Sequence, residues 1–370
     1  MKIAIILGTR PEIIRLSVII RECMKYFETI LIHTGQNFDP ELSKVFFEEM
    51  DIPEPSIYLN CNGGHLGDRI GKIISESYTA LQSNEPDAVL ILGDTNSALA
   101  AISAKRLKIP IFHLEAGNRS YDINVPEEIN RKIVDHISDI NMTYSQIAKQ
   151  YLVREGIPPD RVIVTGSPLA EVLGNLKSQI QESSILNDLG LLKDEYIIFS
   201  VHREENVDQS SNLEKILTLI GQVHEKFKIP VICTLHPRTR DKLTGSKLQV
   251  PAGIQLHSPF GYLDYIQLQM NSFIAISDSG TISEEANILG FPAINLRSIH
   301  ERPEVFEEIA PTLSVGDIQH MITAIEFQKK HKSQWVKDYM AKDVSSKVIN
   351  IIMSYTRVIN RYDWKTDQSF

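Results

Sequence analysis

Acidic and basic side chains crowd one short segment of the chain. The stretch HLEAGNRSYDINVPEEINRK, residues 113–132, carries Glu115, Arg119, Glu127 and Arg131. Carboxylates that share a small volume raise one another's pKa, and such groups act as general acids or bases near neutral pH. The segment is therefore either a solvated loop that enters a helix or one wall of an acid–base reaction centre.

Two acids follow neighbouring apolar runs. Asp94 comes after AVLIL (88–92), and Glu115 comes after IFHL (111–114). In an open parallel sheet, ligands bind beyond the carboxyl ends of the strands, so both carboxylates are expected at the same edge. An Asp at such a position is often only the N-cap of the next helix. A second carboxylate beside it favours acid–base chemistry over capping alone.

The helix expected from Pro126 accounts for part of the acidity. Glu127 and Glu128 fall in its first turn, where the helix dipole favours acids. Glu127 and Arg131 are four residues apart and are positioned to pair on its surface. A buried stripe is expected from Ile129, Ile133 and Ile137. Helix chemistry explains at least one glutamate, but not the charged residues of the loop before it.

The turn after the first apolar run has the composition of an anion site. In GTRPE (8–12), Gly8 permits a close turn and Pro11 suits the first turn of a helix. Backbone amides at a helix start favour an anion, and Arg10 and Arg15 are placed to add charge-assisted contacts to a phosphate. An ordinary turn with solvated arginines is the alternative.

Three loops of the second half have similar features. SDSGTISEEA (277–286) joins a strand, a small-residue turn and a helix start, which together predict a phosphate cradle. Glu285 lies one turn further along, where a glutamate often binds ribose hydroxyls. In VHREEN, His202 precedes an arginine, and LHPRTR repeats the pattern at His236.

Short β-branched runs alternate with helical patterns, which predicts parallel sheets built from βαβ units. The expected strands are 2–7, 29–34, 88–92, 111–114 and 162–165 in the first half, and 196–201, 230–235, 254–257, 273–277 and 292–296 in the second. Helices are expected from Pro11, over 40–50 and 66–82, from Ser97, from Pro126 and over 211–226. The predicted fold class is α/β, with two doubly wound Rossmann-like domains facing each other across a cleft.

The length of the chain also favours two domains, because 370 residues exceed what one hydrophobic core usually supports. A Gly-Ser-Pro turn within TGSPLAEVL (165–173) is the expected hinge. The predicted domains are 1–167, carrying the acids, and 168–349, binding a nucleotide. The C-terminal stretch 350–370 is expected to pack back on the first domain.

Composition excludes several classes of function. With 38 basic and 47 acidic residues, the net charge of −9 argues against nucleic acid or an anionic membrane as a partner. No apolar run approaches the ~20 residues that a membrane helix needs, and three scattered cysteines fit a reducing cytoplasm. Metal-ligand motifs, GxGxxG, Walker A and GxSxG are all missing from the sequence, so no metal or redox cofactor is expected.

Seven motifs in order resemble one enzyme family. They are GTRPE, GDT, HLEAG, PEEINR, HREEN, SDSG…EEA and ERPE (301–304), spread over residues 3–305. Together they are similar to the non-hydrolysing UDP-N-acetylglucosamine 2-epimerases. The resemblance implies a two-Rossmann glycosyltransferase-type fold, usually as a homodimer, and a UDP-sugar substrate. It implies inversion at C2 without a cofactor, by elimination of UDP to a 2-acetamidoglycal and re-addition.

The resemblance also implies roles for individual residues. It matches Asp94, Glu115 and Glu127 to the catalytic acids and His202 to an active-site histidine. The residues matched to substrate or UDP binding are Arg10, Arg15, His236, Ser279, Gly280, Thr281 and Glu285.

Departures from the family pattern bear on the substrate. Arg15 stands where many members have Lys, and Thr281 replaces the second Gly of an SGG turn; both changes should keep phosphate binding. GQNFD in place of GQH, with the altered HPRTR loop, puts in doubt the allosteric UDP-N-acetylglucosamine site of some bacterial members. The motifs are more similar to a capsule and O-antigen branch. That branch converts UDP-2-acetamido-2,6-dideoxy-L-talose to UDP-N-acetyl-L-fucosamine.

Four alternatives remain at this level. An epimerase of UDP-N-acetylglucosamine and UDP-N-acetylmannosamine uses the same residues. A glycosyltransferase of the same fold needs an acceptor groove and no acids on both faces of C2. A non-catalytic nucleotide-sugar-binding regulator would tolerate loss of the acids, and a hydrolysing relative would release free N-acetylmannosamine.

Overall fold

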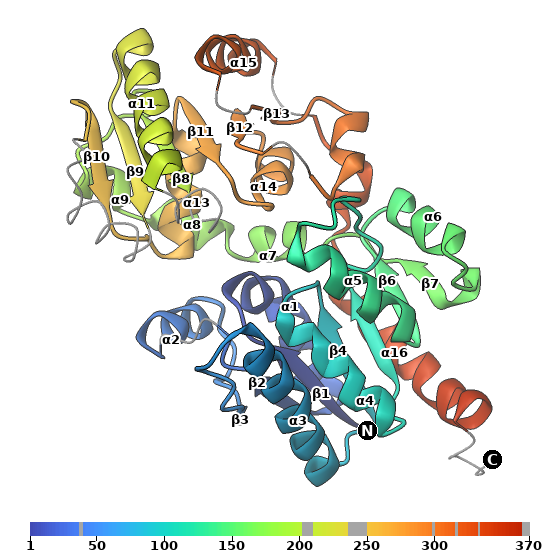
Figure 1. Ribbon diagram of the computed structural model, residues 1–370. Helices are drawn as coiled ribbons and strands as arrows, with labels where there is room; N and C mark the ends of the chain where they lie inside the picture. The colour runs from blue at the N-terminus through green and yellow to red at the C-terminus, as the bar shows by residue number, and fades with distance from the viewer. Residues whose placement is uncertain are drawn as a thin grey trace. The chain divides into compact units, whose positions relative to one another are not determined.

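The chain folds into two compact units in a computed structural model (Figure 1). The structure describes residues 1–36, 40–201, 210–235, 250–297, 300–314, 317–331 and 334–364. The first unit comprises Met1–Gly174 and Lys337–Phe370, and the second comprises Asn175–Val336. Within the described ranges, no helix combines the length and apolar content that a membrane crossing needs.

The first unit is built on a parallel sheet with strand order β3-β2-β1-β4-β5-β6-β7. Its strands are β1 (Lys2–Leu7), β2 (Glu28–His33), β3 (Ile57–Tyr58), β4 (Ala88–Leu92), β5 (Ile111–Leu114), β6 (Ile140–Thr143) and β7 (Val162–Val164). The order reverses between β1 and β4. Ligands of doubly wound sheets bind at such a switch point, beyond the carboxyl ends of the strands.

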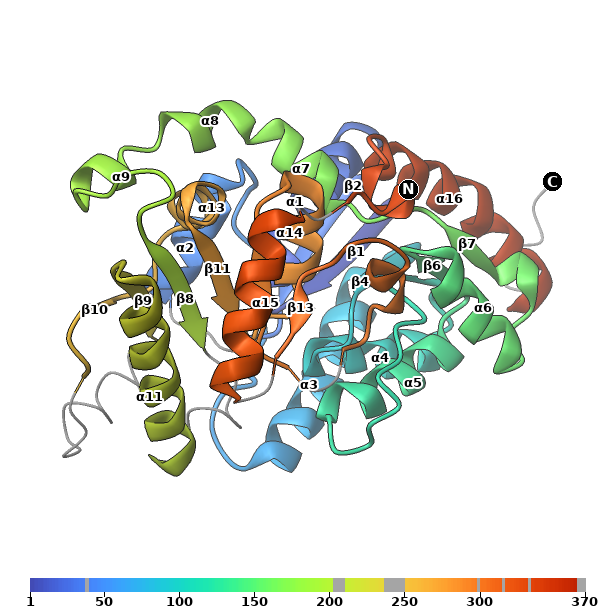
Figure 2. The same cartoon turned by 90° about the horizontal axis from the view of Figure 1, so that it is seen from above.

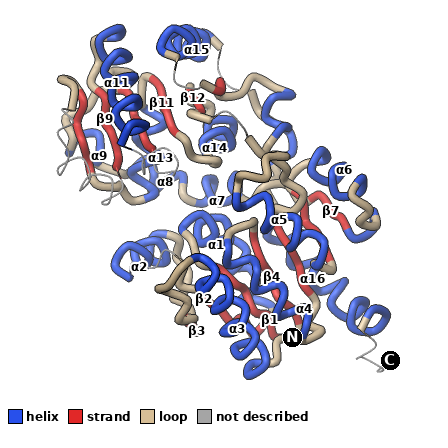
Figure 3. Tube along the Cα trace, in the orientation of Figure 1, coloured by secondary structure: helices blue, strands red, loops and turns tan. Residues whose placement is uncertain are grey.

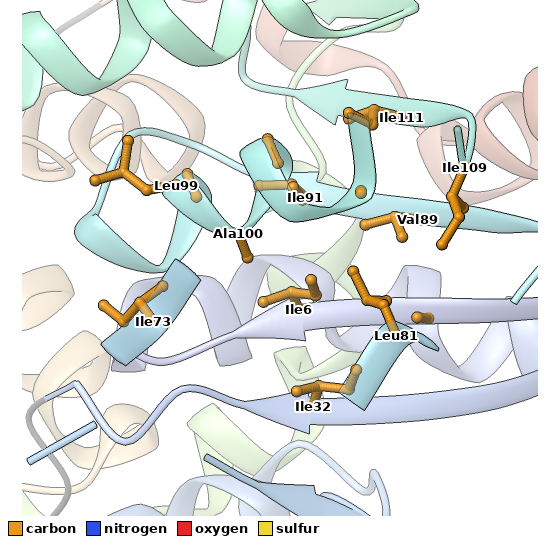
Figure 4. Close-up of a cluster of buried hydrophobic side chains, with 14 of the residues drawn as sticks. Ile6, Ile32, Ile73, Leu81, Val89, Ile91, Leu99, Ala100, Ile109 and Ile111 are labelled. Atoms are coloured by element: carbon orange, nitrogen blue, oxygen red, sulfur yellow. The ribbon is translucent and has the colours of Figure 1, made fainter. Parts of the chain in front are cut away.

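Helices fill both faces of this sheet because alternate strand residues point to opposite sides. They are α1 (Arg10–Tyr26), α2 (Pro40–Glu49), α3 (Leu66–Asn84), η1 (Asn96–Ala100), α4 (Ala101–Arg106), α5 (Pro126–Ile137), α6 (Gln146–Arg154), η2 (Pro159–Arg161), α7 (Leu169–Asn175), η4 (Lys337–Met340), α16 (Val344–Val358) and η5 (Ile359–Asp363). One core joins Ile6 and Ile91 of the strands to Ile73 of α3 and Leu99 of η1 (Figure 4). The C-terminal α16, red in Figure 2, packs against α1.

The second unit repeats the plan with a parallel sheet of order β10-β9-β8-β11-β12-β13. Its elements are α8 (Lys177–Glu182), α9 (Ile185–Asp188), β8 (Ile197–Val201), α11 (Ser210–Phe227), β9 (Val231–Leu235), β10 (Ile254–His257), α13 (Tyr262–Asn271), β11 (Ile274–Ser277), α14 (Ile282–Leu289), β12 (Ala293–Asn295), η3 (Pro303–Glu307), β13 (Thr312–Leu313) and α15 (Ile318–Lys330). Helices α11 and α15 share one core with the sheet, and α9, α13 and α14 share another. The alternation of strand and helix is visible along both units in Figure 3.

The prediction of an α/β fold with two parallel sheets is confirmed. Three strands, β3, β6 and β13, were not expected, and the longest of them is β6. Its sequence INMT is buried throughout but contains an asparagine and a methionine instead of a β-branched run, so the pattern did not indicate a strand. The helix expected from Ser97 begins as the 3-10 helix η1.

The boundaries between the units differ from the expected 167/168 and 349/350. Helix α7 belongs to the first unit, where Glu171 accepts a hydrogen bond of 3.0 Å from Ser345 N of α16. The chain is back in that unit from Lys337, and Asp338 of η4 accepts a hydrogen bond of 3.1 Å from Gln146 N. Long-range contacts such as these determine the boundary and leave no local signal in the sequence.

Candidate active site

Asp94 lies just beyond the carboxyl end of β4. Arg131 donates to Asp94 Oδ2 through Nε at 2.9 Å and Nη2 at 2.6 Å, and Asn130 Nδ2 donates to the Asp94 carbonyl at 3.0 Å. The helix that follows is capped by Thr95, whose side chain accepts from Ser97 N, so Asp94 is not the N-cap. Its carboxylate, with a side chain 23% exposed, is held by α5 at the edge where ligands bind.

Glu115 follows β5, the neighbouring strand. Its φ of +66° is in the left-handed region, which costs an ordinary residue roughly 1–2 kcal/mol. The carboxylate lies 3.4 Å from Arg15 Nη1 and accepts hydrogen bonds of 3.3 Å from Tyr144 Oη and Asn118 Nδ2. A Cβ built on Gly93 would lie 3.8 Å from Glu115 Oε2, so this carboxylate sits beside the residue that precedes Asp94.

Helix α5 places a third carboxylate on the same side. Glu127 is half-buried, and no hydrogen bond or ion pair ties it to any other described residue. Residues three and four apart share a helix face, so Glu127 lies one turn before Asn130 and Arg131, which contact Asp94. The expected Glu127–Arg131 pair is wrong: Arg131 pairs with Asp94 and Glu128.

The buried face of α5 is mostly polar, with Val134 as its fully buried apolar residue, contrary to the expected isoleucine stripe. Ile129 is 55% exposed and Ile133 37% exposed, whereas Asn130, Arg131 and Asp135 are buried. Ile137 is the one stripe residue that packs against the core. The helix turns its polar side to the sheet because that side meets the charged strand ends.

Glu128 and Arg119 hold the loop in place. Glu128 is buried and accepts hydrogen bonds of 3.0 Å from the backbone and side chain of Ser120. Arg119 Nη1 donates to Asp135 at 2.7 Å, and its Nε and Nη2 donate to Glu155 at 2.8 and 2.6 Å. Arg119, which helix chemistry did not explain, is therefore part of an internal ion-pair network with Asp135 and Glu155.

The GTRPE turn is satisfied from within. Glu12 Oε2 accepts hydrogen bonds from Gly8 N at 2.6 Å and Thr9 N at 2.9 Å, and Thr95 donates to Oε1. Burial raises the pKa of Glu12 to about 7, against the opposing effect of these hydrogen bonds. The amides expected to bind an anion are therefore occupied by a carboxylate, and the side chain of Arg10, whose guanidinium lies 5.6 Å from the ring centre of Phe46, is the remaining basic group of the turn.

The second unit has a turn of small residues between β11 and α14. Ser279 N donates to Ser277 Oγ at 3.1 Å, and Thr281 N donates to Ser279 Oγ at 3.3 Å. A Cβ on Gly280 would come within 2.9 Å of Glu301 Oε1, so only glycine fits there without displacement. Arg297 is buried beside the turn, donating to the Asp278 carbonyl at 3.0 Å and to Glu301 at 2.9 Å.

Glu285 lies on the first turn of α14 and is held by a neighbouring helix. Its Oε2 accepts a hydrogen bond of 3.1 Å from Gln269 Nε2 of α13, and both residues are buried. The adjacent Glu284 instead pairs with Arg302 at 3.0 Å. The two glutamates therefore have different surroundings: Glu284 pairs with an arginine, and Glu285 accepts from a neutral amide.

Two of the expected site residues, His202 and His236, lie outside the described residues. Among the described residues, no group of three or more His, Cys, Asp and Glu side chains could hold a metal ion. The cysteines Cys23, Cys61 and Cys233 are buried and unpaired with one another.

The sequence reasoning missed several residues that the structure brings to these sites. Tyr144 follows β6 and was missed with that strand. Arg131 was expected to pair on the helix surface and Asn130 was not considered, although both contact Asp94 from α5. Arg297 follows β12, and applying the strand-end rule to that strand would have found it.

Comparison with known proteins places the chain in a family. A sequence model of the UDP-N-acetylglucosamine 2-epimerases matches residues 21–353. The chain belongs to the UDP-N-acetylglucosamine 2-epimerase family. The UDP-N-acetylglucosamine 2-epimerase of Methanocaldococcus jannaschii is 38% identical over 363 residues, covering 95% of this chain and 99% of that protein. Its structure in complex with UDP-GlcNAc and UDP superposes with a TM-score of 0.89 and covers 95% of this chain and 99% of that one.

Two further relatives show the breadth of the family. The structure of the Rickettsia bellii UDP-N-acetylglucosamine 2-epimerase is 39% identical, covers 99% of both chains and has a TM-score of 0.91. The UDP-2,3-diacetamido-2,3-dideoxy-D-glucuronate 2-epimerase of Pseudomonas aeruginosa is 34% identical over 332 residues, covering 87% of this chain and 90% of that protein. Relatives of this chain are therefore named for different UDP-sugars.

Proposed function

We propose that the protein is a C2 epimerase of a UDP-linked N-acetylhexosamine. The observation that carries the proposal is the pair of carboxylates at neighbouring strand ends, Asp94 set against Arg131 and Glu115 set against Arg15. Glu127, one helix turn from Arg131, supplies the third acid. Membership of the 2-epimerase family supports the reaction class.

The reaction requires acid–base groups on both faces of C2. A carboxylate removes the C2 proton, the C–H electron pair becomes the C1=C2 double bond, and the C1–O pair leaves with UDP. The 2-acetamidoglycal is then protonated at C2 from the opposite face, and UDP adds back to C1. A single carboxylate serves one face, so at least two acids are needed.

The proposed UDP site uses hydrogen-bond donors for the diphosphate and one carboxylate that accepts from the ribose hydroxyls. We propose that Ser279, Gly280 and Thr281 hold the diphosphate at the start of α14 and that Glu285 accepts from the ribose hydroxyls. We also propose Arg10 as a contact of UDP. We propose that Arg15 holds the carboxylate of Glu115 instead of binding UDP, because Arg15 is 2% exposed and is paired with that carboxylate.

The sugar itself is the finer part of the proposal. The motifs favour UDP-2-acetamido-2,6-dideoxy-L-talose, which would be converted to UDP-N-acetyl-L-fucosamine. The names of the M. jannaschii and R. bellii relatives favour UDP-N-acetylglucosamine. Separate incubations with the two sugars decide between them by the rate of C2 epimerisation.

Amide variants of the three acids test the roles. Asp94→Asn, Glu115→Gln and Glu127→Gln should each lower turnover at least ~10²-fold, the scale of a general acid–base contribution. The matched control is Glu54→Gln, an exposed acid in a loop of the same unit, which should leave turnover unchanged. A wild-type rate for any of the three removes that residue from the mechanism.

The state of assembly follows from the resemblance. We propose a homodimer, which light scattering would detect as twice the mass of one 41.9-kDa chain. A mass of one chain at micromolar concentration would refute it.

A further inference from the structure

His113 is buried beneath the candidate active site with an oxygen acceptor at each ring nitrogen. The residue is 0% exposed and belongs to β5, two positions before Glu115. Its Nε2 lies 2.8 Å from the Gly93 carbonyl of the adjacent turn. Its Nδ1 lies 2.9 Å from Asp135 Oδ1 of α5, and Asp135 is also 0% exposed.

The surroundings favour a protonated imidazole. Nε2 is in hydrogen-bond geometry with the Gly93 carbonyl. Nδ1 lies 2.9 Å from Asp135 Oδ1 but outside hydrogen-bond geometry, so this contact stabilises the ring through charge when the ring is an imidazolium. The charges nearby agree: the carboxylate of Asp135 lies between His113 and Arg119, and Arg119 also pairs with Glu155, which His136 contacts at 3.2 Å.

The electrostatic environment acts in the same direction. Burial by itself lowers the pKa of His113, but Asp135, the Gly93 carbonyl and the nearby Asp94 outweigh it and raise the pKa above its ordinary value. Asp135 is in turn held by Arg119 at 2.7 Å and by the Gly117 amide at 3.3 Å.

The ring is tied to the turn that carries Asp94. Gly93 N donates to the Leu114 carbonyl at 2.9 Å, and the Gly93 carbonyl accepts from His113, so residues of β5 hold both polar groups of this glycine. The next residue is Asp94, which Asn130 and Arg131 hold from α5. From β5, His113 therefore holds the peptide group between Gly93 and Asp94 in place.

We propose that His113 is a positioning residue, an imidazolium anchored by Asp135 that fixes the Gly93–Asp94 turn for proton transfer at C2. The role in turnover rests on the proposed epimerase function. The charge state and the position of the turn do not depend on that function.

Two substitutions separate the contacts of the ring. In His113→Gln the amide Nε2 occupies the place of the ring Nε2 and donates to the Gly93 carbonyl. In His113→Asn the amide Nδ2 replaces the ring Nδ1 and faces Asp135, but nothing reaches Gly93. A displacement of about 1 Å at a reacting group costs up to ~10² in rate. His113→Asn should therefore lose kcat by up to that factor with KM nearly constant, and His113→Gln should retain at least ~10 times more kcat than His113→Asn.

A merely structural histidine gives a different result. Equal kcat in the two variants, or losses that follow their melting temperatures, overturns the proposal. If the wild-type enzyme turns over neither UDP-sugar, the proposed epimerase function is wrong. The positioning role of His113 is then tested by crystal structures of the variants instead of by their kcat. Displacement of Asp94 in His113→Asn but not in His113→Gln supports the proposal, and an unmoved turn in His113→Asn refutes it.

The charge is measured on the wild-type chain, so the test survives a variant that fails to fold. The wild-type protein is labelled with ¹⁵N-histidine and studied by NMR. The ring signals that are missing from the spectrum of His113→Gln, or of a second variant, His113→Phe, belong to His113. Both nitrogens of His113 should stay protonated as the pH rises past 6.5, the ordinary midpoint of an imidazole. A ring that loses its second proton at or below that pH contradicts the proposal.

Discussion

Gly8→Ala tests the close packing of the first strand end. The Cβ of an alanine here would lie 2.0 Å from Thr34 Oγ1 and 2.3 Å from Ser97 Oγ, far inside van der Waals contact. Thr34 and Ser97 are buried and hydrogen-bonded to each other at 2.7 Å. The substitution must break this bond, at about 0.5–1.5 kcal/mol, and overpack the site, at about 1–3 kcal/mol.

The expected loss in the free energy of unfolding is about 2–4 kcal/mol, measured by urea denaturation. Because the cost comes from two hydroxyl groups, it should shrink when both are removed. In the background Thr34→Ala with Ser97→Ala, the same Gly8→Ala change should cost less than about 1 kcal/mol. A cost within about 0.5 kcal/mol in the wild-type background, or an equal cost in both backgrounds, refutes the reasoning.

Three further changes test other parts of the structure. The pKa of Glu12 is raised to about 7 from 4.5, so the folded chain binds a proton at Glu12 more tightly than the unfolded chain does. The free energy of unfolding should therefore fall by about 3 kcal/mol as pH rises from 4.5 through 7, and Glu12→Gln should remove this fall. If urea denaturation gives the same pH profile for Glu12→Gln as for the wild-type protein, the burial argument is contradicted. Arg119→Met removes the guanidinium that the carboxylates of Asp135 and Glu155 share, and it should cost about 3–5 kcal/mol, against nearly none for the exposed Arg106→Met. Equal costs in thermal melts of the two variants would exclude a buried network. Gln269→Leu removes one hydrogen bond that holds Glu285, the glutamate proposed to bind ribose, so it should weaken UDP binding about tenfold in calorimetry but weaken 2′-deoxy-UDP binding much less. Equal weakening of the two ligands would exclude that role.

The strand ends were predictable from local patterns. Buried parallel strands are short apolar runs, so AVLIL and IFHL marked β4 and β5 and placed Asp94 and Glu115 at one sheet edge. The same rule failed at INMT, where the polar Asn141 is buried among the strands and disguises β6. Tyr144, which donates to Glu115, was missed for that reason alone.

The partners of the acids were not predictable, because they are distant in the sequence. Arg131 lies 37 residues from Asp94, and the local rule for helix pairs assigned it to Glu127 instead. The isoleucines of α5 show the same limit. Periodicity indicates that one face of a helix differs from the other, but here the sheet edge is charged and the polar face is the buried one.

Deuterium incorporation at C2 tests the central claim most directly. The protein is incubated in deuterated water with UDP-N-acetylglucosamine and, separately, with UDP-2-acetamido-2,6-dideoxy-L-talose, and the products are identified by NMR. We expect deuterium at C2 of an epimerised sugar that still carries UDP, and a rate at least ~10²-fold lower for Asp94→Asn. Return of both sugars unlabelled by the wild-type protein would contradict C2 epimerisation of these substrates, and release of free sugar with UDP would indicate hydrolysis instead.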